Sequence, residues 1–213
     1  VDGVGTISGV VHSIAYANPK TCLGESFHTD AIDDIKTSFE ISFMRDLDAA
    51  IMVADDAAEI KVIIVKSASE KFFSAGADIK AFHENDVAGN VELIHISHQT
   101  LDKIAASQKV FIAAINGHAL GGGLEVALAC DLRFAAVGSY TIGLPEVTLG
   151  LLPGAGGTQR LSRLIGASRA LELMITGERV SPENALQLGI INRLFPAGKL
   201  LYETETFARR LTE

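Results

Sequence analysis

Two kinds of hydrophobic pattern alternate along the chain. The runs Val62–Val65 and Val110–Ile115 are apolar throughout, and a third short run follows at Leu132–Ala136. Such runs are typical of strands in a parallel sheet that is covered on both faces. Ser38–Ala54 and Val91–Ala106 instead carry apolar residues every three or four positions, which predicts amphipathic helices. This alternation of strands and helices predicts an α/β fold with right-handed crossovers.

Shorter segments complete the pattern. Val4–Tyr16 predicts one or two short strands, and a turn follows at Asn18-Pro19. The polar stretch Thr21–Thr37 has no clear period and is interpreted as a loop or a marginal helix. We also expect a helix N-cap at Ser38, helices at Leu124–Cys130, Ser168–Thr176 and Pro182–Leu188, and a last strand at Ile190–Leu194.

The composition is that of an acidic globular domain. Of the 213 residues, 48% are apolar and 21% are charged, and the net charge is −8. The acidic balance argues against a nucleic-acid partner, because binding to phosphates requires a basic surface. No apolar run is long enough to span a membrane. Cys22 and Cys130 provide neither a disulfide framework nor metal-ligand spacing, so we expect no metal and a reducing compartment, bacterial cytoplasm or mitochondrial matrix.

The first candidate site is the segment Phe-Ser-Ala-Gly-Ala-Asp-Ile-Lys at residues 73–80. We interpret Phe72–Asp78 as a turn whose small residues let a ligand approach the bare backbone. Taken alone, the segment is equally explained as an ordinary turn with small residues for packing.

The second candidate site is Ile-Asn-Gly-His-Ala-Leu-Gly-Gly-Gly-Leu-Glu at residues 115–125. A buried strand leads through a glycine-rich turn into a helix, whose free N–H groups and positive dipole end suit a developing oxyanion. Glu125 is either a reacting group or an acid that stabilises the helix dipole. The spacing fits neither a dinucleotide-binding motif nor a P-loop. We interpret His118 as structural or merely near the site.

The third candidate site combines Gly-Leu-Pro-Glu-Val at residues 143–147 with Leu-Pro-Gly-Ala-Gly-Gly-Thr at residues 152–158. One predicted strand and its turn separate Glu146 from Glu125, so the two carboxylates can meet in one pocket. Water addition needs such a pair, because one group activates the water and the other delivers a proton. Taken separately, each acid would be an ordinary solvated side chain.

In their order and spacing the three motifs resemble those of the enoyl-CoA hydratase/isomerase (crotonase) superfamily, and enoyl-CoA hydratases most closely. The resemblance covers residues 62–195 closely and residues 1–18 loosely. It implies an α/β fold built as a spiral of repeated ββα units, with residues 1–198 as the core domain. Residues 20–37 are interpreted as an insertion or loop, and residues 199–213 as the start of a C-terminal helical module that is largely absent from this chain.

The resemblance also implies a role for each matched residue. The N–H groups of Ala77 and Gly122 would form an oxyanion hole on the thioester oxygen. Glu125 would act as the base and Glu146 as the acid, while the Gly154 N–H would help to hold the water. The residues matched to coenzyme A binding are Ala75, Gly76, Asp78, Ile79 and Lys80. No cofactor is implied, since coenzyme A is part of the substrate.

The implied activity is hydration of a 2-enoyl-CoA to a 3-hydroxyacyl-CoA. Family isomerases commonly keep only the acid matched by Glu146, so the presence of both carboxylates favours a hydratase. A Δ3,Δ2-enoyl-CoA isomerase and a non-catalytic binding subunit remain alternatives. The family forms trimers, often paired, so we expect a homotrimer or a dimer of trimers. Because the chain lacks an initiator Met and ends in a polar helical pattern, we expect further residues at both ends.

Overall fold

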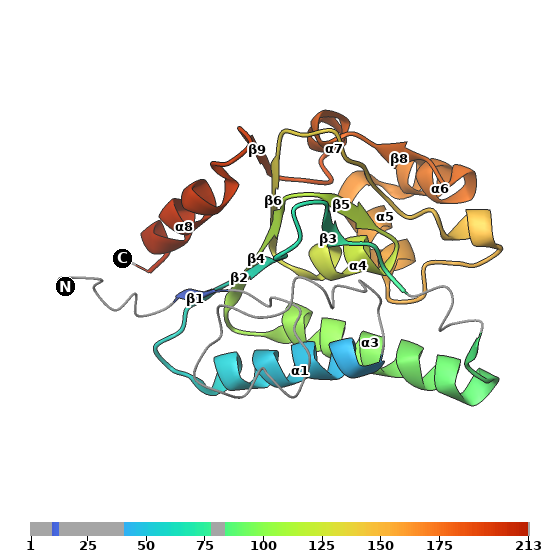
Figure 1. The fold of residues 1–213 in the computed structure, drawn as a ribbon, viewed down its shortest axis with the longest axis horizontal. Helices are drawn as coiled ribbons and strands as arrows, with labels where there is room; N and C mark the ends of the chain where they lie inside the picture. The colour runs from blue at the N-terminus through green and yellow to red at the C-terminus, as the bar shows by residue number, and fades with distance from the viewer. Residues whose placement is uncertain (1–9, 13–40, 78–83, 213) are drawn as a thin grey trace.

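The strands of the fold form two sheets (Figure 1). The structure is a computed structural model that describes residues 10–12, 41–77 and 84–212. Within these residues the first sheet is parallel throughout, in the order β1 (Val10–His12), β2 (Val62–Lys66), β4 (Val110–Ile115), β6 (Leu132–Ala136) and β9 (Arg193–Phe195). The second sheet has the order β3 (Phe72–Ser74), β5 (His118–Leu120), β7 (Ile142–Gly143) and β8 (Arg179–Val180), and only its β7–β8 pair is antiparallel among the described strands.

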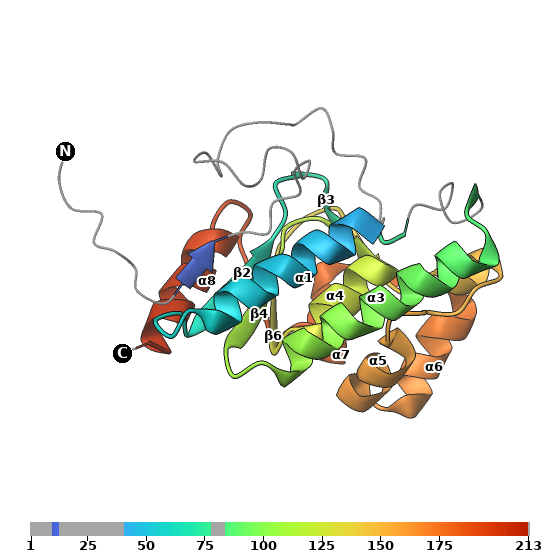
Figure 2. The same ribbon diagram turned by 90° about the horizontal axis from the view of Figure 1, so that it is seen from below.

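Helices cover both faces of the first sheet. α1 (Ile41–Asp56) and α3 (Val87–Ala106) lie side by side, as Figure 2 shows, and Figure 1 shows α8 (Leu200–Arg210) apart from this pair. α4 (Gly122–Ala129) packs against α3 and the second sheet. The remaining helical elements are η1 (Glu146–Leu149), α5 (Gly157–Ile165), α6 (Ala167–Thr176) and α7 (Pro182–Leu188).

Within the described residues, a ββα unit occurs three times in succession. The units are β2-β3-α3, β4-β5-α4 and β6-β7-α5, with η1 inserted before α5. In each unit the first strand joins the first sheet and the second strand joins the second sheet. The expected spiral of ββα units is therefore confirmed.

Alternate residues of the central strands face two different cores. In β2, Ile63 and Val65 face the main core, which also contains buried residues of α1, α3 and α4. Val62 and Ile64 face a second core, which is closed by Leu200 and other residues of α8. Because both faces are covered, apolar residues occupy successive positions of β2 from Val62 to Val65.

Most predicted helices are confirmed with changes at their ends. α3 begins at Val87, four residues before the predicted start, because the side chain of Asp86 accepts a hydrogen bond from the Gly89 N–H at 2.8 Å and caps the helix. α4 begins two residues earlier than expected. The expected N-cap at Ser38 and the segment Thr21–Thr37 lie outside the described residues, and of Val4–Tyr16 only β1 is described.

The prediction was wrong for the short strands. Phe72–Ser74 and His118–Leu120 were expected to be turn, yet they form β3 and β5 and pair with each other. Strands of three residues are too short to show a period and form only because the partner strand is adjacent. The last strand lies at Arg193–Phe195 rather than Ile190–Leu194, since Ile190 and Ile191 are buried in the turn after α7. The amphipathic helix α5 was not predicted.

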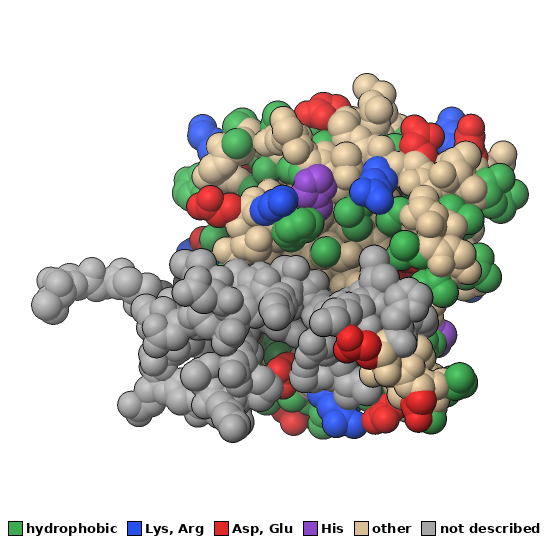
Figure 3. All heavy atoms as spheres, turned by 45° about the vertical axis from the view of Figure 1, so that its right-hand side comes forward, with side chains coloured by type: hydrophobic (Ala, Val, Ile, Leu, Met, Phe, Trp, Pro, Cys, Tyr) green, Lys and Arg blue, Asp and Glu red, His purple; other side chains and the backbone are tan. Residues whose placement is uncertain are grey.

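On the face in Figure 3, Lys and Arg side chains are scattered among acidic and apolar ones. None of the helices described is both long and apolar enough to cross a membrane. Within the same residues, no three His, Cys, Asp or Glu side chains are grouped so that they could hold a metal ion.

Candidate active site

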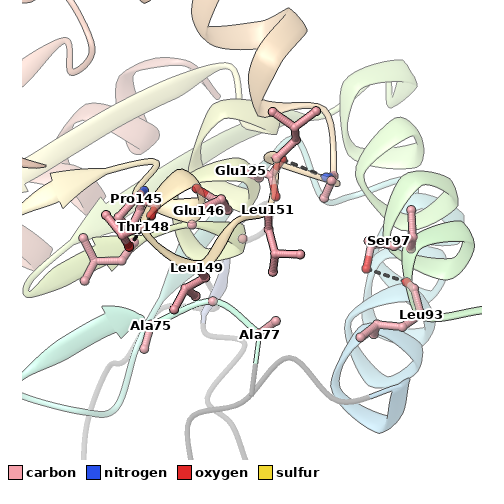
Figure 4. A pocket seen from close by; sticks show the side chains of 18 of the residues that line it. Ala75, Ala77, Leu93, Ser97, Glu125, Pro145, Glu146, Thr148, Leu149 and Leu151 are labelled. Atoms are coloured by element: carbon pink, nitrogen blue, oxygen red, sulfur yellow. Dashed lines mark hydrogen bonds between the residues drawn. The ribbon is translucent and has the colours of Figure 1, made fainter. Parts of the chain in front are cut away.

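A cavity of about 340 Å³ lies between α3, the turn from β5 to α4, and the segment around η1. Its lining includes Ala75, Gly76, Ala77, Gly122, Glu125, Glu146 and Gly154. Residues of all three sequence motifs thus meet at one place, although up to about 80 positions separate them in the chain. Figure 4 shows the two glutamates on one side of the cavity, opposite Ala75 and Ala77.

Glu125 is a buried carboxylate held by backbone N–H groups. It lies in the first turn of α4 and is 2% exposed. Its Oε1 accepts hydrogen bonds from the N–H groups of Ala155 and Gly157, each at 2.8 Å. Gly157 is the first residue of α5, so the positive end of that helix also faces the carboxylate. Within the part of the chain that is described, no group donates to Oε2.

Opposing effects act on the ionisation of Glu125. Burial raises its pKa above the ordinary value, because the carboxylate is removed from water. The N–H groups of Gly157 and Ala155, and then the charges of Arg160 and His98, act in the opposite direction. The carboxylate form therefore has specific support inside an apolar site.

Glu146 has a different environment. It begins η1, and no described residue hydrogen-bonds to its buried Oε2. Burial, with a smaller contribution from Glu125, raises the pKa of Glu146 to about 7, and its own backbone N–H opposes this only in part. The two acids thus differ, since Glu125 is held by two N–H groups and Glu146 readily keeps a proton.

The segment Ala75–Ala77 lies against the start of α4. Gly76 has φ +85°, and a β carbon at this position would lie 2.8 Å from Leu120 O and 3.0 Å from Gly122 N. Only glycine allows both this conformation and this approach. Ala77 and Gly122 consequently line the same cavity. The small residues of the first motif therefore serve this close packing.

Gly154 lies on the loop that leads into α5 and lines the cavity. Its carbonyl oxygen is hydrogen-bonded to Nε2 of His98 on α3. A β carbon at Gly154 would come within 2.7 Å of Cδ1 of Ile94, so the loop packs closely on α3. α3 therefore fixes the position of the loop beside Glu125.

The rest of the cavity is mostly apolar, and the sequence motifs did not indicate its walls. Its side chains come from α3 and from the segment after Glu146: Leu93, Ile94, Ser97, Leu149, Leu151 and Leu152. Ser97 is buried and its hydroxyl donates to Leu93 O at 2.7 Å, so it presents no free donor (Figure 4). A small apolar cavity with two acids suits a chain that is apolar apart from one reacting end.

Other residues considered from the sequence lie elsewhere. Asp78, Ile79 and Lys80 are outside the described residues, so their predicted contacts with coenzyme A stay predictions. His118 does not line this cavity, and its Nδ1 accepts from the Thr141 N–H at 3.1 Å, as expected for a structural histidine. Cys130 is 3% exposed in the core, and burial raises its pKa to about 12.

The sequence analysis assigned no role to the supporting residues Ala155, Gly157 and Arg160, although the first two lie inside the third motif. The signal that points to them is the run Gly-Ala-Gly-Gly-Thr-Gln-Arg at residues 154–160, where glycines precede an amphipathic helix. Such a helix start supplies N–H groups to an anion, and here that anion is Glu125.

The chain is similar to known proteins over most of its described length. The family description "Enoyl-CoA hydratase/isomerase" matches residues 34–213. A short-chain-enoyl-CoA hydratase of Clostridium acetobutylicum is 34% identical over 168 residues, which are 79% of this chain and 64% of that protein.

Solved structures agree with this similarity. A crystal structure of an enoyl-CoA hydratase from Geobacillus kaustophilus has 49% identity and a TM-score of 0.81, covering 82% of this chain and 66% of that one. An enoyl-CoA hydratase from Bacillus anthracis has 38% identity and a TM-score of 0.79, covering 82% and 67%. This chain thus spans about two thirds of the length of these relatives. By its motifs, its ββα spiral and these matches, the chain belongs to the enoyl-CoA hydratase/isomerase (crotonase) superfamily.

Proposed function

We propose that the chain hydrates 2-enoyl-CoA thioesters to 3-hydroxyacyl-CoA thioesters. The observation that carries the proposal is the contrast between the buried Glu125 and the half-buried Glu146 in one mostly apolar cavity. Glu125 is supported as a carboxylate by two N–H groups, whereas the pKa of Glu146 is raised to about 7. Burial raises the pKa of both acids, but Glu125 has two N–H donors from other residues that oppose this effect. A difference of this kind between two neighbouring carboxyl groups suits a base and an acid that act in one reaction.

The proposed reaction uses each acid once. Glu125 removes a proton from water as the water oxygen bonds to the β carbon of the enoyl thioester. The double-bond electrons move towards the thioester oxygen, and Glu146 delivers its proton to the α carbon. Solvent exchange then returns a proton to Glu146 and removes one from Glu125. The sum is addition of one water molecule.

The backbone supplies the remaining parts of this proposal. The N–H groups of Ala77 and Gly122 stabilise the negative charge that develops on the thioester oxygen, and one such donor is typically worth about 3 kcal/mol. The Gly154 N–H helps to hold the water. Ala75 and Gly76, together with Asp78, Ile79 and Lys80, border the coenzyme A moiety. No cofactor takes part in this scheme.

An isomerase is the second candidate, and one observation favours it. Glu146 alone, with a pKa near 7, is suited to removing and returning a proton at adjacent carbons. A non-catalytic binding subunit is the third possibility left from the sequence.

One assay separates these functions. The chain is incubated with crotonyl-CoA, and the absorbance of the conjugated enoyl thioester is followed together with product analysis by mass spectrometry. A hydratase removes the absorbance and adds the mass of one water. Conversion of a 3-enoyl-CoA without hydration of crotonyl-CoA would show an isomerase, and no reaction with either substrate would contradict both enzymatic functions.

A further inference from the structure

Arg160 lies behind the loop that holds Glu125. Its Nη1 donates to the carbonyl oxygen of Ala155 at 2.8 Å, and its Nη2 donates to Oδ1 of Asp102 on α3 at 2.9 Å. The Arg160 side chain is only 16% exposed, whereas Asp102 is 74% exposed. Ala155 therefore contacts Arg160 through its carbonyl and Glu125 through its N–H.

The loop is closely fitted to the guanidinium group. Gly156, which lies between the two residues that donate to Glu125, has φ +97°. A β carbon at Gly156 would collide with Nη1 of Arg160. Both the backbone conformation and the contact require glycine at this position. A displacement of Arg160 would therefore change the positions of the two N–H groups that bind Glu125.

The charges around Glu125 come from three elements of the described structure. Arg160 faces it from α5, His98 from α3, and Glu146 from η1. Arg160 and His98 oppose the effect of burial on Glu125, which raises its pKa. Loss of the Arg160 cation would therefore favour the protonated form of Glu125, which cannot accept a proton from water.

We propose that Arg160 is a positioning residue for the base Glu125. It keeps the Ala155 and Gly157 N–H groups on Glu125 Oε1 and supports the carboxylate with its charge, while Asp102 anchors it to α3. This inference rests on the proposed hydratase function, because it assigns a purpose to an ionised Glu125. Arg160 itself does not line the cavity, so no direct contact with the substrate is assigned to it.

Three variants of the chain test the proposal by the pH dependence of crotonyl-CoA hydration. Arg160→Gln is expected to lower kcat by about 10- to 100-fold, the scale of a misplaced reacting group, and to move the acid limb of the profile to higher pH. Arg160→Lys keeps the charge, but an ammonium group cannot donate to Ala155 and Asp102 with the fixed geometry of a guanidinium. The acid limb of the pH profile should therefore remain at the same pH, while kcat should still fall. Binding of the 3-hydroxyacyl-CoA product should change in neither variant.

The matched control is Arg163→Gln, which removes the same charge from an exposed position on the same helix. Its kcat and pH profile should equal those of the unaltered chain. If the unaltered chain does not hydrate crotonyl-CoA, the proposed function fails and this inference fails with it. If it does, and Arg160→Gln behaves like Arg163→Gln, only this inference is overturned. Should Arg160→Gln fail to fold by circular dichroism, a folded Arg160→Lys variant with unchanged kcat would overturn it.

Discussion

Glu146 lies directly over Gly121, the residue that precedes α4. A β carbon at Gly121 would come within 3.0 Å of Glu146 Oε1. Gly121 also has φ +54° and donates its N–H to Gly143 O at 2.9 Å. The turn that presents the Gly122 N–H therefore also sets the position of Glu146, because both depend on the absence of a side chain at Gly121.

We predict that Gly121→Ala lowers hydratase kcat by at least about tenfold, since the added methyl displaces the Glu146 carboxylate. Gly150→Ala is the control, because Gly150 also has a positive φ, +70°, but a β carbon there meets nothing within 4 Å. Steady-state kinetics of both variants measures the difference. Equal losses in the two variants would show that backbone strain, and not contact with Glu146, is responsible.

We predict that Glu125→Gln and Glu146→Gln each lower kcat by at least about 100-fold, the scale of one lost acid–base group. Binding of a coenzyme A product should survive both changes, because neither carboxylate is assigned to the coenzyme A moiety. Turnover and product affinity, measured side by side, check this. Near-normal turnover in either variant would contradict the two-carboxylate mechanism, and tolerance of Glu125→Gln alone would indicate an isomerase.

The raised pKa of Glu146 predicts a pH dependence of both rate and stability. As the acid, Glu146 must be protonated, so kcat should fall as the pH rises through about 7. A carboxyl with a raised folded-state pKa stabilises the fold below its unfolded pKa, and this contribution is lost as the pH rises through the folded pKa. For Glu146 this loss of stability occurs between pH 4.5, the ordinary pKa of the group, and about pH 7, its pKa in the folded state.

Urea unfolding at pH 5 and pH 8 measures this contribution. The free energy of unfolding should decrease less between these pH values in Glu146→Gln than in the unaltered chain, because the amide does not titrate. An identical decrease in both proteins would show that Glu146 is ionised in the folded state throughout, contrary to the environment described above.

We predict that Arg133→Ala destabilises the fold by at least about 1–3 kcal/mol, the cost of leaving a buried carbonyl group without its donor. Arg133 is 5% exposed, and its guanidinium donates to Ile190 O at 2.9 Å and Cys130 O at 2.6 Å. It thus joins the end of α4 to the turn before β9. The exposed Arg169→Ala is the control. Chemical denaturation of both checks the prediction, and similar midpoints would contradict it.

The family resemblance also predicts assembly as a homotrimer or a dimer of trimers. Large apolar side chains are exposed on the described surface, among them Leu171 at 55% and Ile175 at 62%, one turn apart on α6. Contiguous apolar surface of this kind is commonly covered by another subunit. Light scattering coupled to size exclusion measures the mass. A monomer with full hydratase activity would contradict the expected assembly.

The sequence alone determined the central sheet and the residues that carry the candidate chemistry. β4 is apolar at every position, and β2 at every position before the terminal Lys66, because both of their faces are covered. Such runs are recognisable in the sequence. Glu125 and Glu146 stand out because each accompanies a glycine- or proline-containing turn next to a predicted strand. Local patterns of this kind are visible without a structure, since they depend on neighbours in the chain.

Only the tertiary structure decided what surrounds those residues. β3 and β5 form because each supplies the hydrogen-bond partner of the other, 46 positions away at Phe72 and His118. Glu125 receives its N–H groups from residues 30 and 32 positions later, and Arg160 reaches back to Asp102 on α3. The protonation tendencies of the two acids follow from burial and from these distant donors. No local pattern contains that information, because it arises only when separate segments are packed against one another.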